Sequence, residues 1–208
     1  MATYADRNGG PEVKLCLDLC SGSGGFSSAF RSSGQWEVIT VDVNPRYRPD
    51  MVLDLIDAVE NRQDHPDFWN MHPDVILASP PCERWSVANS HGPQSGIYQA
   101  SRVLGAVLEI IAAMRPKGWV IENPRGRMRW FLGKPSMTVG LSQFGYKTVK
   151  PTDFWTNIDV GLLRDINTRK NPSGRKWSYD APRNPADRAR MPYRLSEKIL
   201  ESFEEVQA

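Results

Sequence analysis

Short apolar runs that alternate with helix-like segments constrain the fold of this chain more strongly than any other feature. Each run is short enough to be a single strand, and several are followed by glycine, proline or asparagine, which end strands. Parallel strands need helical crossovers, so the alternation predicts an α/β fold of the Rossmann-like kind, a mostly parallel sheet with helices on both faces. The predicted strands are residues 13–19, 36–43, 51–53, 74–78 and 119–122; the predicted helices begin at residue 26 and span residues 55–63 and 99–114.

The chain changes character after residue 158. Residues 167–192 are rich in Pro, Asn, Arg and Lys and nearly lack aliphatic side chains, so we expect an extended or partly disordered arm rather than a second core. Residues 195–206 show one apolar helical face. We therefore predict a main α/β domain over 1–157, a short basic arm over 158–194 and a C-terminal helix over 195–208 that packs back on the domain.

Basic residues are concentrated in the second half of the chain. The net charge of the 208 residues is only +2, yet residues 115–194 hold 17 Lys and Arg against 6 Asp and Glu. One interpretation is an electrostatic footprint for a polyanion such as nucleic acid; the alternative is a solvated face with scattered ion pairs.

The ends of the chain and its cysteines favour a cytoplasmic protein. The first residues are polar and lack a signal segment, and we expect no window to reach the apolar length of a membrane span. Cys16, Cys20 and Cys82 have no zinc-type spacing and are odd in number, so a reducing compartment is the simpler interpretation and no metal is predicted.

A glycine-rich loop, Ser21 to Gly25, follows the first predicted strand. Glycines there let the backbone approach a ligand closely and present amides to it, although a plain tight turn is the alternative. Asp42, at the end of the second strand, is placed to accept hydrogen bonds from ribose hydroxyls, and Asp54 to meet an adenine amino group. The spacing Gly22-x-Gly24-Gly25 departs from the dinucleotide fingerprint, so the loop predicts a nucleoside-containing cofactor other than NAD.

Cys82 follows Pro80-Pro81 at the carboxyl end of the fourth predicted strand, the edge of a parallel sheet where ligands bind. A lone cysteine is more often a small buried hydrophobe. Two prolines and a polar loop, residues 86–96, flank this one, which favours a rigidly aimed nucleophile. We expect the loop to be mobile.

Glu122-Asn123-Pro124 ends the fifth predicted strand, beside the fourth. These residues could simply begin a helix, with Pro124 in its first turn. The functional interpretation gives Glu122 a proton-transfer role across the same cleft as Cys82. A cofactor loop, a thiol and a carboxylic acid on one sheet edge together favour catalysis.

The segment Asp18 to Phe26, Pro80-Pro81-Cys82 and Glu122-Asn123 resemble the DNA cytosine-5 methyltransferase family, in its order and at about its spacing. The resemblance extends from about Leu15 to Asn157. It implies transfer of a methyl group from S-adenosylmethionine to carbon 5 of cytosine in DNA. In that family the cysteine adds to carbon 6 of the base while the glutamate protonates or hydrogen-bonds ring nitrogen 3, and the base is flipped out of the helix.

The resemblance also implies roles for individual residues. Catalysis is expected of Cys82, Glu122 and Lys150. The cofactor-binding set lies at the ends of the first four strands and is expected to comprise Asp18, Cys20, Ser21, Gly22, Gly24, Gly25, Asp42, Val43, Asp54, Leu55, Ser79 and Pro81. The residues expected to contact nucleic acid are polar or basic and are Arg84, Ser86, Arg169, Lys170, Arg175 and Lys176. The loop at 86–96 is expected to close over the flipped base.

The chain departs from the family pattern at four places. Pro124 replaces a valine, and Lys150-Pro151-Thr152 stands where an Arg-x-Arg element is expected. The motif before the last helix is reduced to residues 192–195. The arm at 158–194 occupies the place of the large target-recognition domain, a compact form that resembles phage or mobile-element enzymes.

Three alternatives stay open at this point. The same chemistry could act on RNA or a free pyrimidine nucleotide, although the surplus of basic residues favours a polynucleotide. The donor could carry a group other than methyl. A non-catalytic nucleic-acid-binding relative is the rival of another class, and the intact Cys82 and Glu122 count against it.

Overall fold

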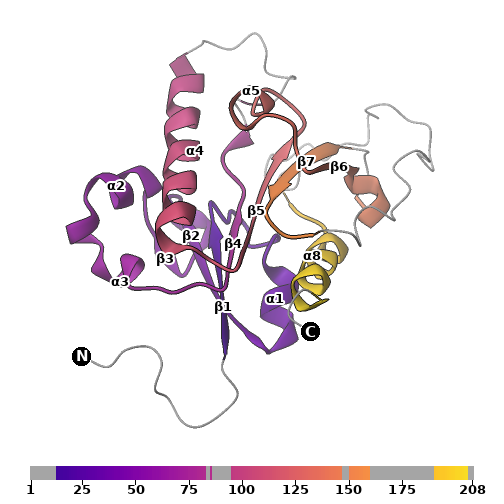
Figure 1. Ribbon diagram of the computed structural model, residues 1–208, viewed down its shortest axis with the longest axis horizontal. Coiled ribbons are helices and arrows are strands. Elements are labelled where there is room, and N and C mark those ends of the chain that lie inside the picture. The colour runs from indigo at the N-terminus through magenta and orange to yellow at the C-terminus, as the bar shows by residue number, and fades with distance from the viewer. Residues whose placement is uncertain (1–12, 83–84, 86–94, 147–149, 160–189, 206–208) are drawn as a thin grey trace.

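The computed structural model describes residues 13–82, 85, 95–146, 150–159 and 190–205. They form a seven-stranded sheet in the order β3-β2-β1-β4-β5-β7-β6 (Figure 1). The strands are β1 Lys14–Leu19, β2 Trp36–Asp42, β3 Met51–Val52, β4 Val75–Ala78, β5 Gly118–Pro124, β6 Met137–Gly140 and β7 Pro151–Thr156. Strands β1 to β5 are parallel, and β7 runs antiparallel between β5 and β6. The predicted fold class, a mostly parallel Rossmann-like sheet with helices on both faces, is confirmed.

Helices cover both faces of the sheet. The α-helices are α1 Ser28–Ser33, α2 Leu55–Glu60, α3 Pro66–Trp69, α4 Ser95–Met114, α5 Arg129–Leu132 and α8 Tyr193–Glu205. Three short 3-10 helices are η1 Pro45–Tyr47, η2 Arg62–Asp64 and η5 Leu141–Phe144. In Figure 1, α2, α3 and α4 lie on one side of the sheet, and α1 and α8 on the other.

Two apolar clusters follow from the alternation of side chains along the central strands. On β1, Cys16 belongs to the cluster under α1 and α8, whereas Leu17 belongs to the cluster under α2 and α4. Phe30 of α1 meets the rings of Trp36 and Phe203 edge-on, at 5.1 and 5.9 Å between centroids. These contacts join the N-terminal part of the sheet to the C-terminal helix.

A serine also fixes the last helix to the first one. The Ser196 hydroxyl on α8 donates to the Phe26 carbonyl at 2.6 Å and accepts from the Ala29 amide at 3.0 Å. It thereby satisfies a backbone amide at the start of α1 that has no partner within that helix. Helix α8 is thus part of the core layer, although it is separated from α1 by most of the chain.

Several predicted boundaries were wrong. Helix α4 begins at Ser95, so the end of the predicted mobile loop is helical; residues 86–94 of that loop lie outside the described part. Strand β5 continues to Pro124 instead of giving way to a helix, because Asn123 and Pro124 pair with Asp153 and Thr152 of β7. Strands β6 and β7 were not predicted. Of the predicted arm, residues 160–189 also lie outside the described part.

The expectation that no window reaches the apolar length of a membrane span was wrong for α4. By length and composition, residues Gly96–Met114 are sufficient to cross a membrane. The helix instead packs on the sheet through a buried apolar face that includes Leu104, Val107 and Ile110. Its outer side is held by ion pairs to the neighbouring segment, Arg62 with Glu109 at 2.8 Å and Arg102 with Glu60.

Gly118, the first residue of β5, lies where the sheet meets α8. A Cβ at this position would lie 2.2 Å from the Phe203 ring and 2.6 Å from Ile158. We expect Gly118→Ala to lower the free energy of unfolding by about 1–3 kcal/mol, the usual cost of overpacking a core. Denaturant unfolding measures the change. Gly105→Ala on α4, where a Cβ meets nothing within 4 Å, is the matched control and should stabilise the protein slightly. Equal stabilities of the two variants would contradict the prediction.

Candidate active site

The glycine-rich loop after β1 is built from left-handed backbone conformations. Cys20, Gly22 and Gly24 have φ values of 54°, 52° and 70°. The Gly24 amide donates to the Ser21 carbonyl at 2.9 Å, and the Ser21 amide donates to Val41 at 3.1 Å, which fixes the loop against β2. Side chains at Gly22 and Gly24 would be strained by φ, although a Cβ at either would meet nothing within 4 Å. The loop therefore turns tightly and leaves open space in front of Gly22 and Gly24.

Asp42 closes this loop from the end of β2. One carboxylate oxygen accepts from the Gly22 amide and the other from the Asn44 amide, both at 2.8 Å. The sequence predicted a ribose acceptor at this position, and the structure adds a second role, because the same carboxylate holds the loop in shape. Each oxygen has a further lone pair that a hydroxyl can use.

The residues after β2 and β3 divide into exposed and buried ones. Val43 is 63% exposed, and the exposed Asp54 caps α2 by accepting from the Ile56 amide at 2.9 Å. Leu55 was predicted to bind the cofactor, but its side chain is buried in the cluster under α2 and α4. Only the backbone of Leu55 is therefore a candidate for a ligand contact.

Asp18 is a fully buried carboxyl near the end of β1. One of its oxygens accepts from the Ser27 hydroxyl at 2.6 Å, while the other has no hydrogen-bond partner in the described residues. Burial raises the pKa of Asp18 to about 7, against the opposing effect of the Ser27 hydrogen bond. A buried acceptor without a partner is costly. Asp18 is thus suited to receive a donor, and a cation most of all, from a bound ligand.

Cys82 is held between two anchored residues. Before it, the Ser79 amide donates to Leu19 at 3.0 Å, and the Asn123 side-chain amide donates to the Pro80 carbonyl at 2.8 Å. After it, the Trp85 amide donates to the Cys82 carbonyl at 3.1 Å, and the Trp85 ring is fully buried. Cys82 itself is half-buried and is not in a disulfide. The backbone around the thiol is therefore fixed from both sides.

Glu122 is 6% exposed and extends from β5 on the strand next to the one that precedes Cys82. Burial raises the pKa of its carboxyl above the ordinary value of 4.5, and the charge of Lys150 and a hydrogen bond from Ser79 oppose that rise. A buried carboxyl with a raised pKa is a candidate proton donor. The register pairs Ala78 of β4 with Ile121 of β5; Glu122 is the next residue of β5, and Cys82 lies four residues after Ala78.

Lys150 lies just before β7 with an unusual φ of 27°. Its charge lowers the pKa of the Glu122 carboxyl. Thr152, two residues on, is fully buried and donates to the Lys150 carbonyl at 3.1 Å. The segment just before β7 therefore supplies a positive charge, that of Lys150, which acts on the Glu122 carboxyl.

The sequence interpretation missed Arg129. Its guanidinium donates twice to the fully buried Asp153, with both contacts at 2.5 Å, and once to the Thr138 hydroxyl at 2.9 Å. Asp153 stands opposite Asn123 in the sheet. This pair ties α5 to the strand beside the candidate site. No local pattern marked it, because its members are 24 residues apart.

The predicted nucleic-acid contacts cannot be placed. Arg84, Ser86, Arg169, Lys170, Arg175 and Lys176 all lie outside the described residues. The remaining predicted site residues lie at or after the carboxyl ends of β1 to β5, or, for Lys150, just before β7, which runs antiparallel to β5, so all of them belong to one edge of the sheet.

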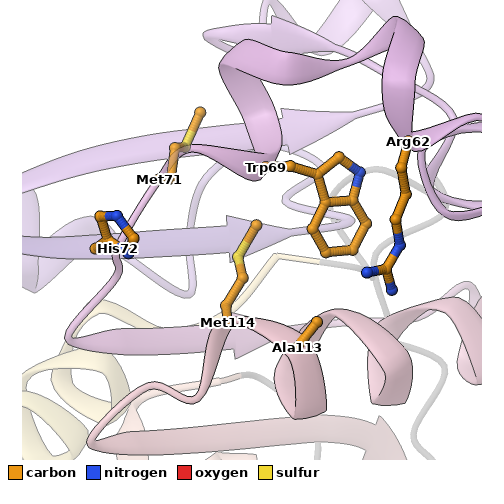
Figure 2. Close-up of a pocket in the computed structure, with 6 residues that line it drawn as sticks. All are labelled: Arg62, Trp69, Met71, His72, Ala113 and Met114. Carbon is orange, nitrogen blue, oxygen red and sulfur yellow. The ribbon is translucent and has the colours of Figure 1, made fainter. Parts of the chain in front are cut away.

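A cavity of about 290 Å³ lies elsewhere, at the end of the sheet where β4 begins (Figure 2). Its lining is mostly apolar and consists of Arg62, Trp69, Met71, His72, Ala113 and Met114. The Arg62 guanidinium lies 4.1 Å from the Trp69 ring centroid. No predicted site residue lines this cavity.

The family model for the C-5 cytosine-specific DNA methylase matches residues 15–148. The matched segment contains the glycine-rich loop, Cys82 and Glu122, and ends two residues before Lys150.

Two relatives share 28% identity with the chain. A protein of frog virus 3 (isolate Goorha), named "Probable DNA (cytosine-5)-methyltransferase", aligns over 186 residues that cover 78% of this chain and 83% of the viral protein. The type II methyltransferase M.AplI of Arthrospira platensis aligns over 158 residues, 74% of this chain but only 41% of the enzyme. The chain thus spans most of the viral relative and less than half of the bacterial one.

A solved structure from an E. coli prophage, described as a DNA modification methyltransferase, matches 69% of this chain and 46% of its own. The identity is 17% and the TM-score 0.49.

Proposed function

Because this chain belongs to the C-5 cytosine-specific DNA methylase family, we propose that it methylates carbon 5 of cytosine in DNA through a covalent adduct with Cys82. The observation that carries the proposal is the pairing of β4 with β5. The first strand leads into the rigidly held Cys82 segment, and the second carries the buried carboxyl of Glu122. The family match, which includes both residues, supports the same assignment.

The Cys82 thiol and the Glu122 carboxyl act together in the first step of the proposed reaction. The Cys82 thiolate forms a bond to carbon 6 of the cytosine, while Glu122 gives its proton to ring nitrogen 3. Carbon 5 then has the electron density of an enamine and takes the methyl group. A base then removes the carbon 5 proton, the bond between carbons 5 and 6 becomes double again as the Cys82 sulfur leaves as a thiolate, and ring nitrogen 3 returns its proton to Glu122. The charge of Lys150 stabilises the carboxylate that Glu122 becomes when it gives up its proton.

S-adenosylmethionine supplies the methyl group from its sulfonium. The residues at the sheet edge fit such a molecule. The partnerless oxygen of Asp18 suits an ammonium group, the Asp42 carboxylate suits ribose hydroxyls, and the open space before Gly22 and Gly24 suits a close backbone approach. Exposed Val43 and Asp54 lie where a purine ring would follow. The proposed set is completed by Cys20, Ser21, Gly25, the Leu55 backbone, Ser79 and Pro81.

Removing the Asp42 side chain tests the cofactor site. We expect Asp42→Ala to weaken S-adenosylmethionine binding by about 1–3 kcal/mol, since ribose hydroxyls and the Gly22 amide both lose their acceptor. Calorimetry measures the affinity. Asp64→Ala, which removes an exposed carboxylate from η2, is the matched control and should bind as the wild type does. An unchanged affinity of Asp42→Ala would mean that the ribose lies elsewhere.

The substrate class is tested directly. The protein is incubated with S-adenosylmethionine labelled in the methyl group and, in parallel, with duplex DNA, single-stranded DNA, RNA and dCMP. Label in 5-methylcytosine of DNA is the expected result. Preferential labelling of RNA or dCMP would overturn the substrate while keeping the Cys82 chemistry, and no transfer to any of the four would favour a non-catalytic role.

The basic arm at 158–194 is proposed to add phosphate contacts in place of a recognition domain, with the domain limits predicted from the sequence. A monomer that acts in the cytoplasm is proposed on the same basis.

A further inference from the structure

An exposed basic and aromatic surface lies on and before α5. We call it the α5 surface and define it as Arg125, Arg127, Trp130 and Phe131. Trp130 is 75% exposed, the highest fraction for any large apolar side chain in the described part of the chain, and Phe131 is 51% exposed. Folding usually buries most of an aromatic ring, so two adjacent exposed rings point to a ligand.

The α5 surface is continuous with the segment that carries Cys82. The Phe131 ring meets the buried Trp85 ring edge-on, with centroids 5.0 Å apart and planes at 75°. The Arg127 amide donates to the Trp85 carbonyl at 2.8 Å. Trp85 in turn donates to the Cys82 carbonyl. The two exposed rings therefore lie next to the candidate site and are fixed to it through one tryptophan.

The charged side chains of the segment that carries α5, residues 123–146, are all basic. Residues 123–146 include Arg125, Arg127, Arg129 and Lys134 and contain no Asp or Glu. Arg129 is held by buried Asp153, which fixes α5 to the sheet. The Arg127 guanidinium lies 5.7 Å from the Trp130 ring centroid, so the surface combines a cation with an aromatic face. A polyanion with planar rings is complementary to both features.

We propose that the α5 surface binds the DNA strand beside the target cytosine, with Trp130 stacked on a neighbouring base and the Arg125 and Arg127 guanidinium groups directed to its phosphates. The inference rests on the proposed function and names a substrate contact for the same site. When the target cytosine leaves the stack, its neighbours lose a stacking partner. An aromatic ring replaces that partner whatever the sequence, because every base has a π face.

A comparison of two proteins on two DNA strands, which we call the stacking cycle, tests whether Trp130 stacks on a base. Fluorescence anisotropy measures the affinity for a short single-stranded DNA with one central cytosine, and for the same strand with abasic sugars on both sides of that cytosine. Trp130→Ala should bind the intact strand about 5- to 150-fold more weakly than the wild type does. Both proteins should bind the abasic strand equally, and Trp130→Phe should keep most of the affinity.

Two results would overturn the stacking contact. One is an unchanged affinity of Trp130→Ala for the intact strand, which would mean that another part of the chain or another partner covers the ring. The other is an equal loss on the intact and abasic strands. Leu108→Ala, which truncates an exposed apolar side chain in the middle of α4, is the control and should bind both strands as the wild type does.

Salt dependence tests the phosphate contact. Arg125→Gln should reduce the slope of log affinity against log salt by about 0.7, the value for one phosphate of a single strand. Arg115→Gln removes another exposed arginine, at the opposite end of the sheet, and should leave the slope unchanged. Equal slopes for the two variants would remove Arg125 from the interface.

Methyl transfer separates this inference from the proposed function. At saturating DNA, Trp130→Ala should keep the wild-type kcat and show a raised KM, since only strand binding is weakened. If the wild type methylates DNA but Trp130→Ala shows no selective loss of affinity for the intact strand, only the proposed α5-surface contact would be overturned. A wild type that binds with the stacking cycle but transfers no methyl group would overturn the proposed reaction and keep the contact.

Discussion

Cys82→Ala should abolish methyl transfer, with a loss of more than about 10³-fold, while S-adenosylmethionine affinity stays close to the wild-type value. The size of the loss follows from the role of the thiol, because removal of a covalent nucleophile leaves only binding and electrostatic effects. The affinity should persist because Cys82 belongs to the anchored segment between Ser79 and Trp85, beside the glycine-rich loop rather than within it. Labelled methyl transfer measures the first quantity and calorimetry the second.

A trapping experiment checks the covalent step itself. A DNA strand with 5-fluorocytosine has no proton at carbon 5 to lose, so the wild-type adduct should remain attached through a denaturing gel. Cys82→Ser is the conservative control; it should trap no adduct and be nearly inactive, because a hydroxyl with an ordinary pKa is a far weaker nucleophile. If Cys82→Ala still methylated at a tenth of the wild-type rate, the covalent mechanism would be wrong.

Glu122→Gln should reduce kcat by about 10²- to 10⁴-fold and leave DNA affinity nearly unchanged, because glutamine keeps a hydrogen bond but has no acidic proton to donate. The buried position of Glu122 raises the pKa of its carboxyl, which keeps the acid form present further toward neutral pH. Single-turnover transfer and strand binding, measured on the same preparation, separate the two effects. Equal losses in both would make Glu122 a binding or structural residue.

The pH dependence gives an independent check on Glu122. The protonated form is the reactive one, so its contribution to the rate should fall as pH rises through its raised pKa, and the glutamine variant should lack that fall. Stability should follow the same sign. A carboxyl with a raised folded pKa contributes most below the unfolded value, near 4.5, and this contribution is lost as pH rises through the folded pKa. As the pH rises from acid to alkaline values, the free energy of unfolding of the wild type should therefore fall relative to that of Glu122→Gln.

The sequence alone was sufficient to locate strands β1 to β5 along the chain and to identify the residues at their carboxyl ends. Strands β1, β4 and β5 are short, apolar and bounded by turn residues, so local periodicity located them within one or two residues. The motifs around Gly22, Cys82 and Glu122 are contiguous in the chain, and the predicted family is confirmed by the match over residues 15–148. Such a motif can be recognised in the sequence because the residues that define it are neighbours in the chain.

Strands β6 and β7 were missed because neither has a strong local signal. Strand β7 includes Pro151 and the charged Asp153, which local propensity disfavours in a strand. Its place is decided by pairing with β5 on one side and β6 on the other, and by the Arg129 ion pair that satisfies Asp153. A membrane-length apolar segment was overlooked in α4 for a related reason, since periodicity drew attention only to its buried face.

What the sequence determined is therefore the fold class and the family, and it supplied the residues that we propose as reactive. Only the tertiary structure decided the environment of each residue. The partnerless oxygen of Asp18, the closure of the loop by Asp42 and the exposure of Trp130 beside Trp85 all arise from segments that are distant in the chain. Burial, and with it a pKa or an exposed aromatic face, depends on the sum of contacts around a side chain, and that sum is defined only when distant segments have packed together.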